Sequence, residues 1–268
     1  MKKKIICIIQ ARTGSKRLPK KILLPIFGKS LLEHMLLRLK GTKKINQICL
    51  ATTIKKEDDI ICQIAKKNKI SIFRGNSNNV LKRFYDCAKK NKADTIIRVT
   101  ADCPLIDTKY INELLGIYDK NNFDYMSNLN YDYLPEGFSS EVFSFASLKK
   151  SFKLAKSKFD KEHVTSFIWS NPKLFRFHHY KGKKNKKFIK NVRLTLDYLE
   201  DFVLIKKIFE NLYKKNSNFS LNDIFAYLQK NKNLLKINKK YTLSHWKKYQ
   251  LKRNKFNKII NDKYILKK

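Results

Sequence analysis

The chain has 268 residues, and 60 Lys or Arg against 22 Asp or Glu give a formal net charge of +38 at pH 7. This length accommodates one sizeable α/β domain with a buried core or two small domains, and the absence of a linker rich in Pro, Gly and Ser favours one. No stretch approaches the roughly 18 apolar residues that a membrane-spanning helix needs, which excludes a membrane span.

The positive charge suggests a nucleic-acid partner, but its make-up argues against one. Only 9 of the 60 basic residues are Arg, although Arg is the residue favoured for phosphate and base recognition. Lys, Asn and Ile are abundant throughout, as an A+T-rich coding sequence would produce. We therefore expect no specific nucleic-acid partner, and a polyanion-binding protein on a degenerate enzyme fold is the weaker alternative.

The cysteines and the N-terminus point to the cytoplasm. The five cysteines form no close pair, which is typical of free thiols in a reducing compartment. The lysines at positions 2–4 precede an apolar run that ends by Gln10, and this run is too short for an export signal.

The most informative stretch begins with the apolar run from Ile5 to Ile9, which predicts a strand buried on both faces. Gly14 and Pro19 interrupt regular structure just beyond, so a loop lies at the carboxyl edge of this strand. Ligands bind at that edge in open α/β sheets, and successive backbone N–H groups in such a loop can hold an anion. The loop is also rich in cations, which suits a polyphosphate. These cations are Arg12, Lys16, Arg17 and Lys21.

The loop has neither the Walker A spacing nor the dinucleotide-binding glycines. It resembles the opening motif of the sugar cytidylyltransferases, enzymes that make CMP-activated sugars, and most closely their spore-coat polysaccharide branch. The pattern Ala-Arg-x-x-Ser-x-Arg-Leu-Pro-x-Lys is met by Ala11, Arg12, Ser15, Arg17, Leu18, Pro19 and Lys21. The resemblance implies that Arg12 and Lys21 are catalytic. It further implies nucleotide contacts from Ala11, Arg12, Gly14, Ser15, Arg17 and Lys21.

Strands and helices are predicted to alternate through residue 120, as in a parallel sheet covered by helices on both faces. Ser30 and Asp107 are placed to cap two of the helices. The acids Glu57, Asp58 and Asp59 are better explained as first-turn residues that offset a helix dipole than as metal ligands. The predicted strands are 45–53, 70–75 and 94–100, and the predicted helices are 31–39, 57–68, 80–90 and 110–118.

A second motif, Thr100-Ala101-Asp102-Cys103-Pro104, ends the strand that begins near residue 94. In similar enzymes this acid coordinates Mg²⁺, which takes one or two carboxylates together with phosphate oxygens. The resemblance makes Asp102 catalytic and a metal ligand, and Thr100 a nucleotide contact. Arg74 is expected to contact phosphate or base, and a structural salt bridge explains it equally well.

The regular alternation lapses between residues 123 and 190. The segment 135–143 is similar to the acceptor region of the family, so Glu136 and Glu141 are expected to face the sugar or a second cation. The motif around His163 opens a predicted helix over 160–169 and implies substrate contact, while its catalytic role is left open. A strand over 174–180 and a polar turn after it predict an arm that projects from the main sheet. In similar enzymes such an arm pairs with a second subunit, so the resemblance implies a homodimer.

Asp197 ends a predicted buried strand over 192–197 and is expected to be catalytic and to join Asp102 as a second metal ligand. The family has Asp-Thr-Pro-Glu-Asp here, whereas this chain has Tyr198-Leu199 in place of Thr-Pro. Glu200 and Asp201 are explained as first-turn helix acids. Ser220 is expected to cap a final helix that ends at Gln229.

These observations predict a three-layer α/β/α fold with a mainly parallel sheet, which the resemblance identifies as the Rossmann-like nucleotide-diphospho-sugar transferase fold. Residues 1–237 would form the nucleotidyltransferase domain and 238–268 a basic extension, whose aromatic residues pack on the domain or meet bases or a membrane surface. The implied reaction is Mg²⁺-dependent cytidylyl transfer from CTP to an acidic sugar or sugar phosphate for bacterial surface polysaccharide. A glycosyltransferase of similar fold is the alternative, although the Asp-x-Asp motif usual in such enzymes is missing at Asp102.

Overall fold

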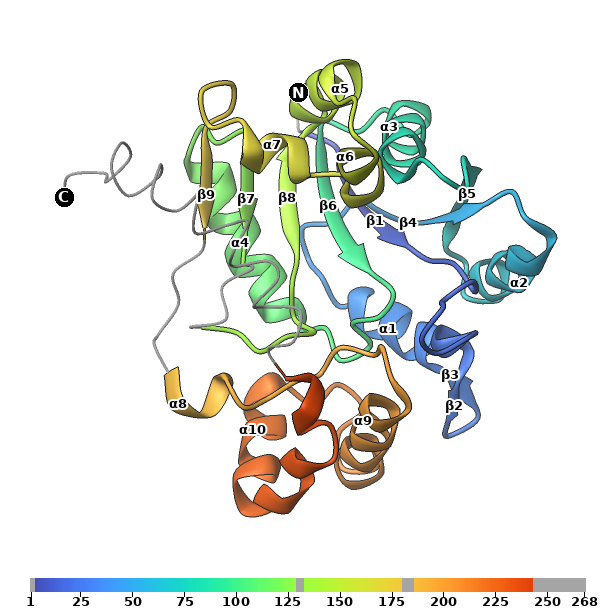
Figure 1. Ribbon diagram of the computed structural model, residues 1–268, viewed down its shortest axis with the longest axis vertical. Coiled ribbons are helices and arrows are strands. Elements are labelled where there is room, and N and C mark those ends of the chain that lie inside the picture. Colours follow the sequence, from blue (N-terminus) through green and yellow to red (C-terminus); the bar gives the residue numbers. More distant parts are fainter. Residues whose placement is uncertain (1–2, 129–132, 180–185, 243–268) are drawn as a thin grey trace.

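The computed structural model describes residues 3–128, 133–179 and 186–242. Its centre is a seven-stranded sheet in the order β5-β4-β1-β6-β8-β7-β9, in which β8 alone runs against the other strands (Figure 1). The predicted mainly parallel sheet is therefore confirmed. The strands are β1 (Ile5–Gln10), β4 (Gln47–Thr53), β5 (Ser71–Gly75), β6 (Thr95–Thr100), β7 (Tyr125–Ser127), β8 (Glu141–Ser144) and β9 (Phe177–His179), and a small separate hairpin is formed by β2 (Pro25–Ile26) and β3 (Lys29–Ser30).

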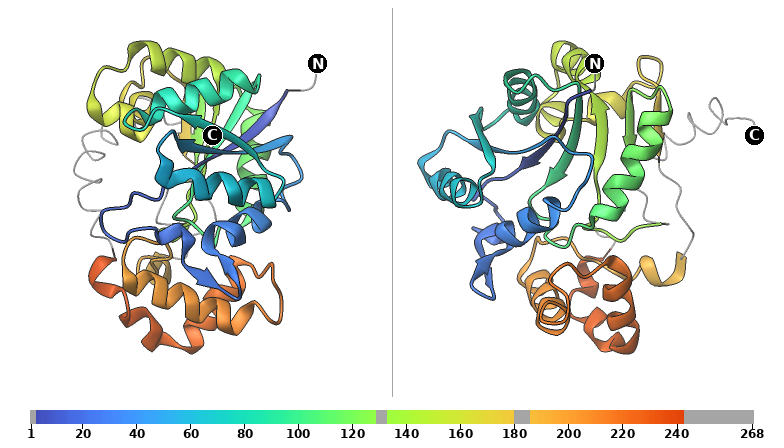
Figure 2. Two further views of the ribbon diagram at one scale, coloured as in Figure 1. Left: turned by 90° about the vertical axis from the view of Figure 1, so that its right-hand side faces the viewer. Right: turned by 180° about the vertical axis from the view of Figure 1, so that it is seen from behind.

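Helices cover both faces of the sheet, as predicted, and a further group packs beyond its carboxyl edge (Figures 1 and 2). Helices α1, α2 and α4 lie on one face, and α3 and α5 lie on the other. The helices are α1 (Leu31–Leu39), α2 (Asp59–Lys67), α3 (Val80–Lys90), α4 (Thr108–Lys120), α5 (Phe145–Leu154), α6 (Lys158–His163), α7 (Ser166–Ser170), α8 (Lys186–Ile189), α9 (Leu199–Leu212) and α10 (Leu221–Lys230).

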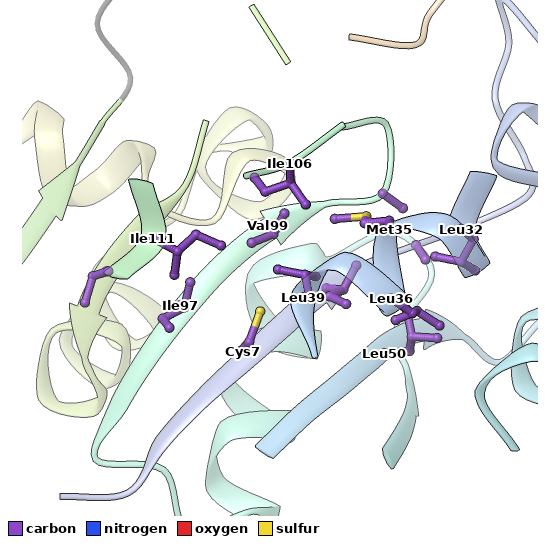
Figure 3. Packing of buried hydrophobic residues seen from close by; sticks show 14 of the residues in the cluster. Cys7, Leu32, Met35, Leu36, Leu39, Leu50, Ile97, Val99, Ile106 and Ile111 are labelled. Carbon is purple, nitrogen blue, oxygen red and sulfur yellow. The ribbon is translucent and has the colours of Figure 1, made fainter. Parts of the chain in front are cut away.

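The central strand β1 explains why the sheet is buried on both sides. Cys7 and Ile9 point into the cluster under α1, α2 and α4, whereas Ile6 and Ile8 point into the cluster under α3 and α5. Figure 3 shows the first cluster, where Cys7 lies among the leucines of α1 and the apolar side chains of β6. A continuous apolar run at alternating faces is what a strand in this position requires.

The predicted helix caps are confirmed. Ser30 and Glu33 form a capping box at α1, in which the Ser30 hydroxyl accepts from Glu33 N and a Glu33 carboxylate oxygen accepts from Ser30 N. Asp107 caps α4 by accepting from Lys109 N at 2.9 Å, and its other oxygen accepts from Leu221 N at 3.0 Å, which joins α4 to the start of α10. Ser220 caps α10.

The single helix predicted over 160–169 is wrong. Residues there form two short helices, α6 and α7, because Val164 between them has a φ of +55° that a helix cannot contain. His163 consequently ends α6 instead of lying in the first turn of a longer helix.

The strand predicted over 174–180 is present as β9, but it belongs to the main sheet. It pairs in parallel with β7 at the sheet edge, so the described part of 123–190 contributes three strands to the central layer. The polar turn after β9 falls largely on residues outside the described ranges, and the dimerising arm stays a prediction.

The strand predicted over 192–197 is also wrong, although the segment is buried and extended. It forms a single bridge between Arg193 and Glu136, and Leu196 N donates to Asp102 O at 2.8 Å. Close approach at this bridge requires Gly137, whose φ is +105° and where a Cβ would lie 2.4 Å from a backbone carbon of Leu194. The segment packs on α9 and α10 in a third apolar cluster.

The C-terminal part of the described chain continues past the predicted domain boundary. Asn238 donates to Arg193 O at 3.0 Å and to Asp201 Oδ1 at 2.8 Å, so residues beyond 237 pack against the segment 193–201. Trp246, Tyr249 and Phe256, the aromatic residues of the predicted extension, lie outside the described residues. None of the helices in the described ranges is long and apolar enough to cross a membrane.

A buried leucine of α1 offers a direct test of the core. Leu36 is fully buried, whereas its neighbour Leu37 is 40% exposed. We expect Leu36→Ala to lower the free energy of unfolding by about 2–5 kcal/mol through lost burial and a residual cavity, and Leu37→Ala to change it by less than about 0.5 kcal/mol. Urea denaturation followed by circular dichroism measures both. Equal losses in the two variants would contradict the assigned face of α1.

The capping box at α1 should contribute stability that is lost at low pH. Burial raises the pKa of Glu33, but hydrogen bonds from Lys67 and Ser30 outweigh it and lower this pKa to about 2. Charged Glu33 therefore adds stability that is complete above the ordinary glutamate pKa of about 4.3 and is lost as the pH falls through about 2. Lys67→Gln should raise the pKa of Glu33, measured by carbon-13 NMR of the carboxyl group. Lys66→Gln, which removes an exposed neighbouring lysine, should leave it in place.

Candidate nucleotide site at the carboxyl edge of the sheet

The loop after β1 is anchored by a buried aspartate. Thr13 is buried at its centre, and Asp58 Oδ1 accepts from both Thr13 N (2.7 Å) and Thr13 Oγ1 (2.8 Å). The other Asp58 oxygen accepts from Thr53 Oγ1 at the end of β4. Asp58 is fully buried, so its prediction as a dipole-offsetting acid misses its main contacts, which fix the loop.

The remainder of this loop presents donors outward. The backbone N–H groups of Arg12, Gly14 and Lys16 have no hydrogen-bond partner within the described residues, while Thr13 O accepts from Ser15 N (2.8 Å). Arg12 and Lys16 are exposed. Unpaired amides beside free cations are the groups that bind an anion.

Lys21, at the end of the loop, reaches across to two aspartates from distant parts of the chain. Its Nζ lies 2.8 Å from Asp197 Oδ1, 3.3 Å from Asp102 Oδ2 and 2.6 Å from Leu196 O. Burial lowers the pKa of Lys21, but Asp102 and Asp197 outweigh this effect and raise it above the usual lysine value. The predicted convergence of Asp102 and Asp197 is therefore present in the structure.

Each of these aspartates has its second oxygen held by another residue. Thr100 Oγ1 donates to Asp102 Oδ1 at 2.5 Å, and Arg193 Nη2 donates to Asp197 Oδ2 at 3.0 Å. Arg17 contributes a further cation, with Nη2 lying 2.6 Å from Asp197 Oδ1. Burial raises the pKa of Asp197, but Lys21, Arg17 and Arg193 together lower it to about 2.

Arg193 is the hub behind Asp197. Its guanidinium is fully buried and pairs with Glu136 (2.6 Å), Asp197 (3.0 Å) and Asp201 (3.0 Å). Burial raises the pKa of Glu136, and Arg193 opposes that rise. Three carboxylates on one guanidinium fix the backbone that carries Asp197, and they place Glu136 beside the aspartates, although the sequence suggested a contact with the sugar.

Glu141 lies in a separate network that joins β6, β7 and β8 to the segment between α6 and α7, and His163 lies at the end of α6 beside that segment. Glu141 Oε1 accepts from Tyr125 Oη and Thr165 Oγ1, each at 2.6 Å, and its other oxygen pairs with Arg98. Arg98 also donates to Gln10 Oε1 at 3.3 Å, which links this network to the end of β1. The His163 ring lies 4.2 Å from that of Phe159, centroid to centroid.

Arg74 is held by the protein at the end of β5. Its guanidinium pairs with Asp59 at 2.6 Å and donates to Thr53 O and Lys55 O at 3.1 and 2.9 Å. These contacts match the salt-bridge explanation considered for Arg74. A nucleotide contact by this residue would require part of this arrangement to open.

The oxygen donors around Lys21 suit a hard divalent cation. Two carboxylates and a main-chain carbonyl converge there, and the ammonium that lies between them is itself a cation. Mg²⁺ is typically held by one or two carboxylates with substrate phosphates completing its ligands. Within the described residues no group of three or more His, Cys, Asp or Glu forms a metal centre, so a bound nucleotide would have to supply the rest.

Comparison with known proteins assigns the chain to a family. The sequence profile of the cytidylyltransferases matches residues 6–241. This chain is a member of the cytidylyltransferase family. An uncharacterised protein of Methanocaldococcus jannaschii is 42% identical over 238 residues, covering 88% of this chain and 94% of that protein. The spore coat polysaccharide biosynthesis protein SpsF of Bacillus subtilis is 30% identical over 233 residues, covering 85% and 95%.

A solved structure agrees with the assignment. A cytidylyltransferase from Leptospira borgpetersenii superposes with a TM-score of 0.82 at 32% identity, covering 87% of this chain and 97% of that one. The resemblance to sugar cytidylyltransferases inferred from the first loop is thus confirmed, and this cytidylyltransferase has the predicted nucleotidyltransferase fold.

Sequence reasoning missed three groups of this cytidylyltransferase site. Asp58 was recognised as an acid near a helix start, but only the fold brings it to Thr13. Arg193 had a visible signal, because a lone cation within an apolar segment requires buried partners. The Leu196 carbonyl had no sequence signal, since every residue has a backbone carbonyl group.

Loss of the loop anchor should weaken both folding and nucleotide binding. Asp58→Asn removes the negative charge and replaces one of the oxygens that accept hydrogen bonds from Thr13 and Thr53 with an amide NH₂ group. We therefore expect a loss of about 1–3 kcal/mol in unfolding free energy. We also expect weaker CTP binding, measured by isothermal titration calorimetry. Asp119→Asn, which changes an exposed acid paired with Lys44, should leave CTP affinity unchanged.

Proposed function

We propose that this protein transfers the cytidylyl group of CTP to a hydroxyl group of a sugar, with release of pyrophosphate. The observation that carries the proposal is the cation-rich loop after β1, which presents backbone amides that no described residue pairs and ends at Lys21 between two aspartates. In the reaction the sugar oxygen bonds to the α-phosphorus and the bond from that phosphorus to the bridging oxygen breaks. Pyrophosphate leaves with the electron pair, and the hydroxyl proton is lost.

The residues of the chain divide this work between them. The amides of the loop with Arg12, Arg17 and Lys21 would bind the phosphates and stabilise the charge that develops on pyrophosphate. Asp102 and Asp197 would hold Mg²⁺, which when bound neutralises the triphosphate and so lets a nucleophile approach. Thr100 and Arg193 keep these carboxylates in place, so that positioning and electrostatics supply most of the catalysis.

The acceptor is proposed to be an acidic sugar or a sugar phosphate used for a surface polysaccharide. The likeness to SpsF, whose name places it in spore-coat polysaccharide synthesis, supports this context. We propose that the network of Glu141 and the neighbouring His163 faces the acceptor. Glu136 contributes through its ion pair with Arg193, which supports Asp197.

Pyrophosphate release tests the proposal directly. The purified protein is assayed with Mg²⁺, each of the four nucleoside triphosphates, and a panel of acidic sugars and sugar phosphates. We expect acceptor-dependent release with CTP and one acceptor, and a fall in kcat of about 100-fold or more in Asp102→Asn and in Asp197→Asn. Asp119→Asn, at an exposed surface pair with Lys44, should retain activity.

Two outcomes would contradict the proposal. Acceptor-dependent release with another triphosphate but not with CTP would overturn the assigned base. Absence of such release with any triphosphate, together with Mg²⁺-dependent stabilisation by a nucleotide sugar in thermal melts, would instead favour a glycosyltransferase.

A further inference from the structure

Three oxygen atoms converge on the ammonium group of Lys21, and hydrogen bonds from other residues hold these oxygens in place. The three-oxygen cluster consists of Asp102 Oδ2, Asp197 Oδ1 and Leu196 O, at 3.3, 2.8 and 2.6 Å from Lys21 Nζ. The Lys21 side chain is only 11% exposed. Its ammonium is therefore largely removed from water and depends on these oxygens.

Neither carboxylate is free to turn away from Lys21. The outer oxygen of Asp102 is fixed by Thr100 Oγ1, and the outer oxygen of Asp197 by the buried guanidinium of Arg193. The peptide that carries the Leu196 carbonyl is held because Asp197 N donates to Asp201 Oδ2 at 2.9 Å. The inner oxygens thus form a preorganised set of cation ligands, with an internal cation already bound.

We propose that the three-oxygen cluster is a cation-exchange site, in which Lys21 is the resting occupant and leaves when a divalent cation and the nucleotide bind together. This inference rests on the proposed function and deepens it. It assigns the Leu196 carbonyl as a third protein ligand for the divalent cation. It gives Lys21 two successive partners, the aspartates in the free protein and the phosphates in the complex.

Electrostatics makes the exchange concerted. An ammonium and a divalent cation repel each other strongly at the distances within this cluster, so both cannot lie between the same oxygens. Arg17, 2.6 Å from Asp197 Oδ1, adds to the repulsion. A triphosphate supplies new anionic partners for Lys21 and Arg17 and further oxygen ligands for the incoming cation. Nucleotide and divalent cation should therefore each tighten the binding of the other.

The inference predicts effects of opposite sign for one substitution. Lys21→Gln removes a phosphate contact and should abolish pyrophosphate release, yet it also vacates the three-oxygen cluster and should raise the affinity of the free protein for a divalent cation. A residue that served only to bind phosphate or to stabilise the fold would not produce that gain.

Manganese binding measures the effect without turnover. Free Mn²⁺ is quantified by electron paramagnetic resonance in titrations of the wild type, Lys21→Gln and Lys16→Gln, with and without CTP and with no acceptor present. In the absence of CTP we expect Lys21→Gln to bind Mn²⁺ at least about tenfold more tightly than the wild type. The tightening caused by CTP should be smaller in Lys21→Gln than in the wild type. In the absence of CTP, Lys16→Gln, which removes the same charge from the same loop, should bind Mn²⁺ as tightly as the wild type does.

A second readout guards against a folding defect. Thermal melts with Mg²⁺ alone should show greater stabilisation of Lys21→Gln than of the wild type, because a ligand that binds only the folded state raises its melting temperature. Lys21→Met, which lacks hydrogen-bonding groups at its end, should behave like Lys21→Gln.

The outcomes distinguish this inference from the proposed function. Equal Mn²⁺ affinity of the free wild type and Lys21→Gln, with CTP-dependent Mn²⁺ binding intact, would overturn the exchange and leave the transferase standing. An equal gain in Lys16→Gln would also overturn it, since overall charge would then explain the effect. Absence of Mn²⁺ binding even with CTP would overturn both.

Discussion

The candidate site depends on keeping two carboxylates, Asp102 and Asp197, close together at the edge of the sheet. Like charges at such separation repel, and the repulsion grows as water is excluded. The protein compensates with Lys21 between them and with Arg17 and Arg193 around Asp197. This compensation is why the pKa of Asp197 lies at about 2 although its side chain is buried.

Arg193 links Asp197 to the rest of the fold through its other ion pairs. A fully buried guanidinium is stable only when its charge is matched, and removing one partner of such a pair typically costs about 3–5 kcal/mol. Here Glu136, Asp197 and Asp201 supply the match, and Asn238 closes the group from beyond α10. The backbone around Asp197 is thereby fixed without being a strand of the sheet.

The loop after β1, on the other side of the site, is held by hydrogen bonds to Asp58. In the loop after β1, Asp58 accepts both donors of Thr13, and Thr13 O accepts from Ser15 N and Lys20 N, while the side chains of Arg12 and Lys16 stay exposed. A rigid anchor with free flanking amides suits a ligand that brings its own negative charge. Lys21 joins the two sides of the site, because it ends the loop after β1 and contacts both Asp102 and Asp197.

The sequence by itself determined the layers, the sheet and the main chemical groups. The apolar run of β1 shows burial on both faces, Ser30, Asp107 and Ser220 mark helix starts, and the motifs that contain Arg12 and Asp102 indicate the family. These signals are local, because a hydrophobic periodicity, a helix cap or a loop motif can be recognised within about ten residues.

Tertiary structure alone decided the contacts between distant segments. Val164, which is fully buried, ends a helix that periodicity would continue, because a residue with a φ of +55° cannot be part of a right-handed helix. The segment 192–197 reads as a strand because it is apolar and alternating, yet it is buried against α9 and α10 beyond the sheet edge. Asp58 meets Thr13 across 45 residues and Lys21 meets Asp197 across 176. Such pairs have no local pattern, since only the folded chain brings these separate segments together at the carboxyl edge of the sheet.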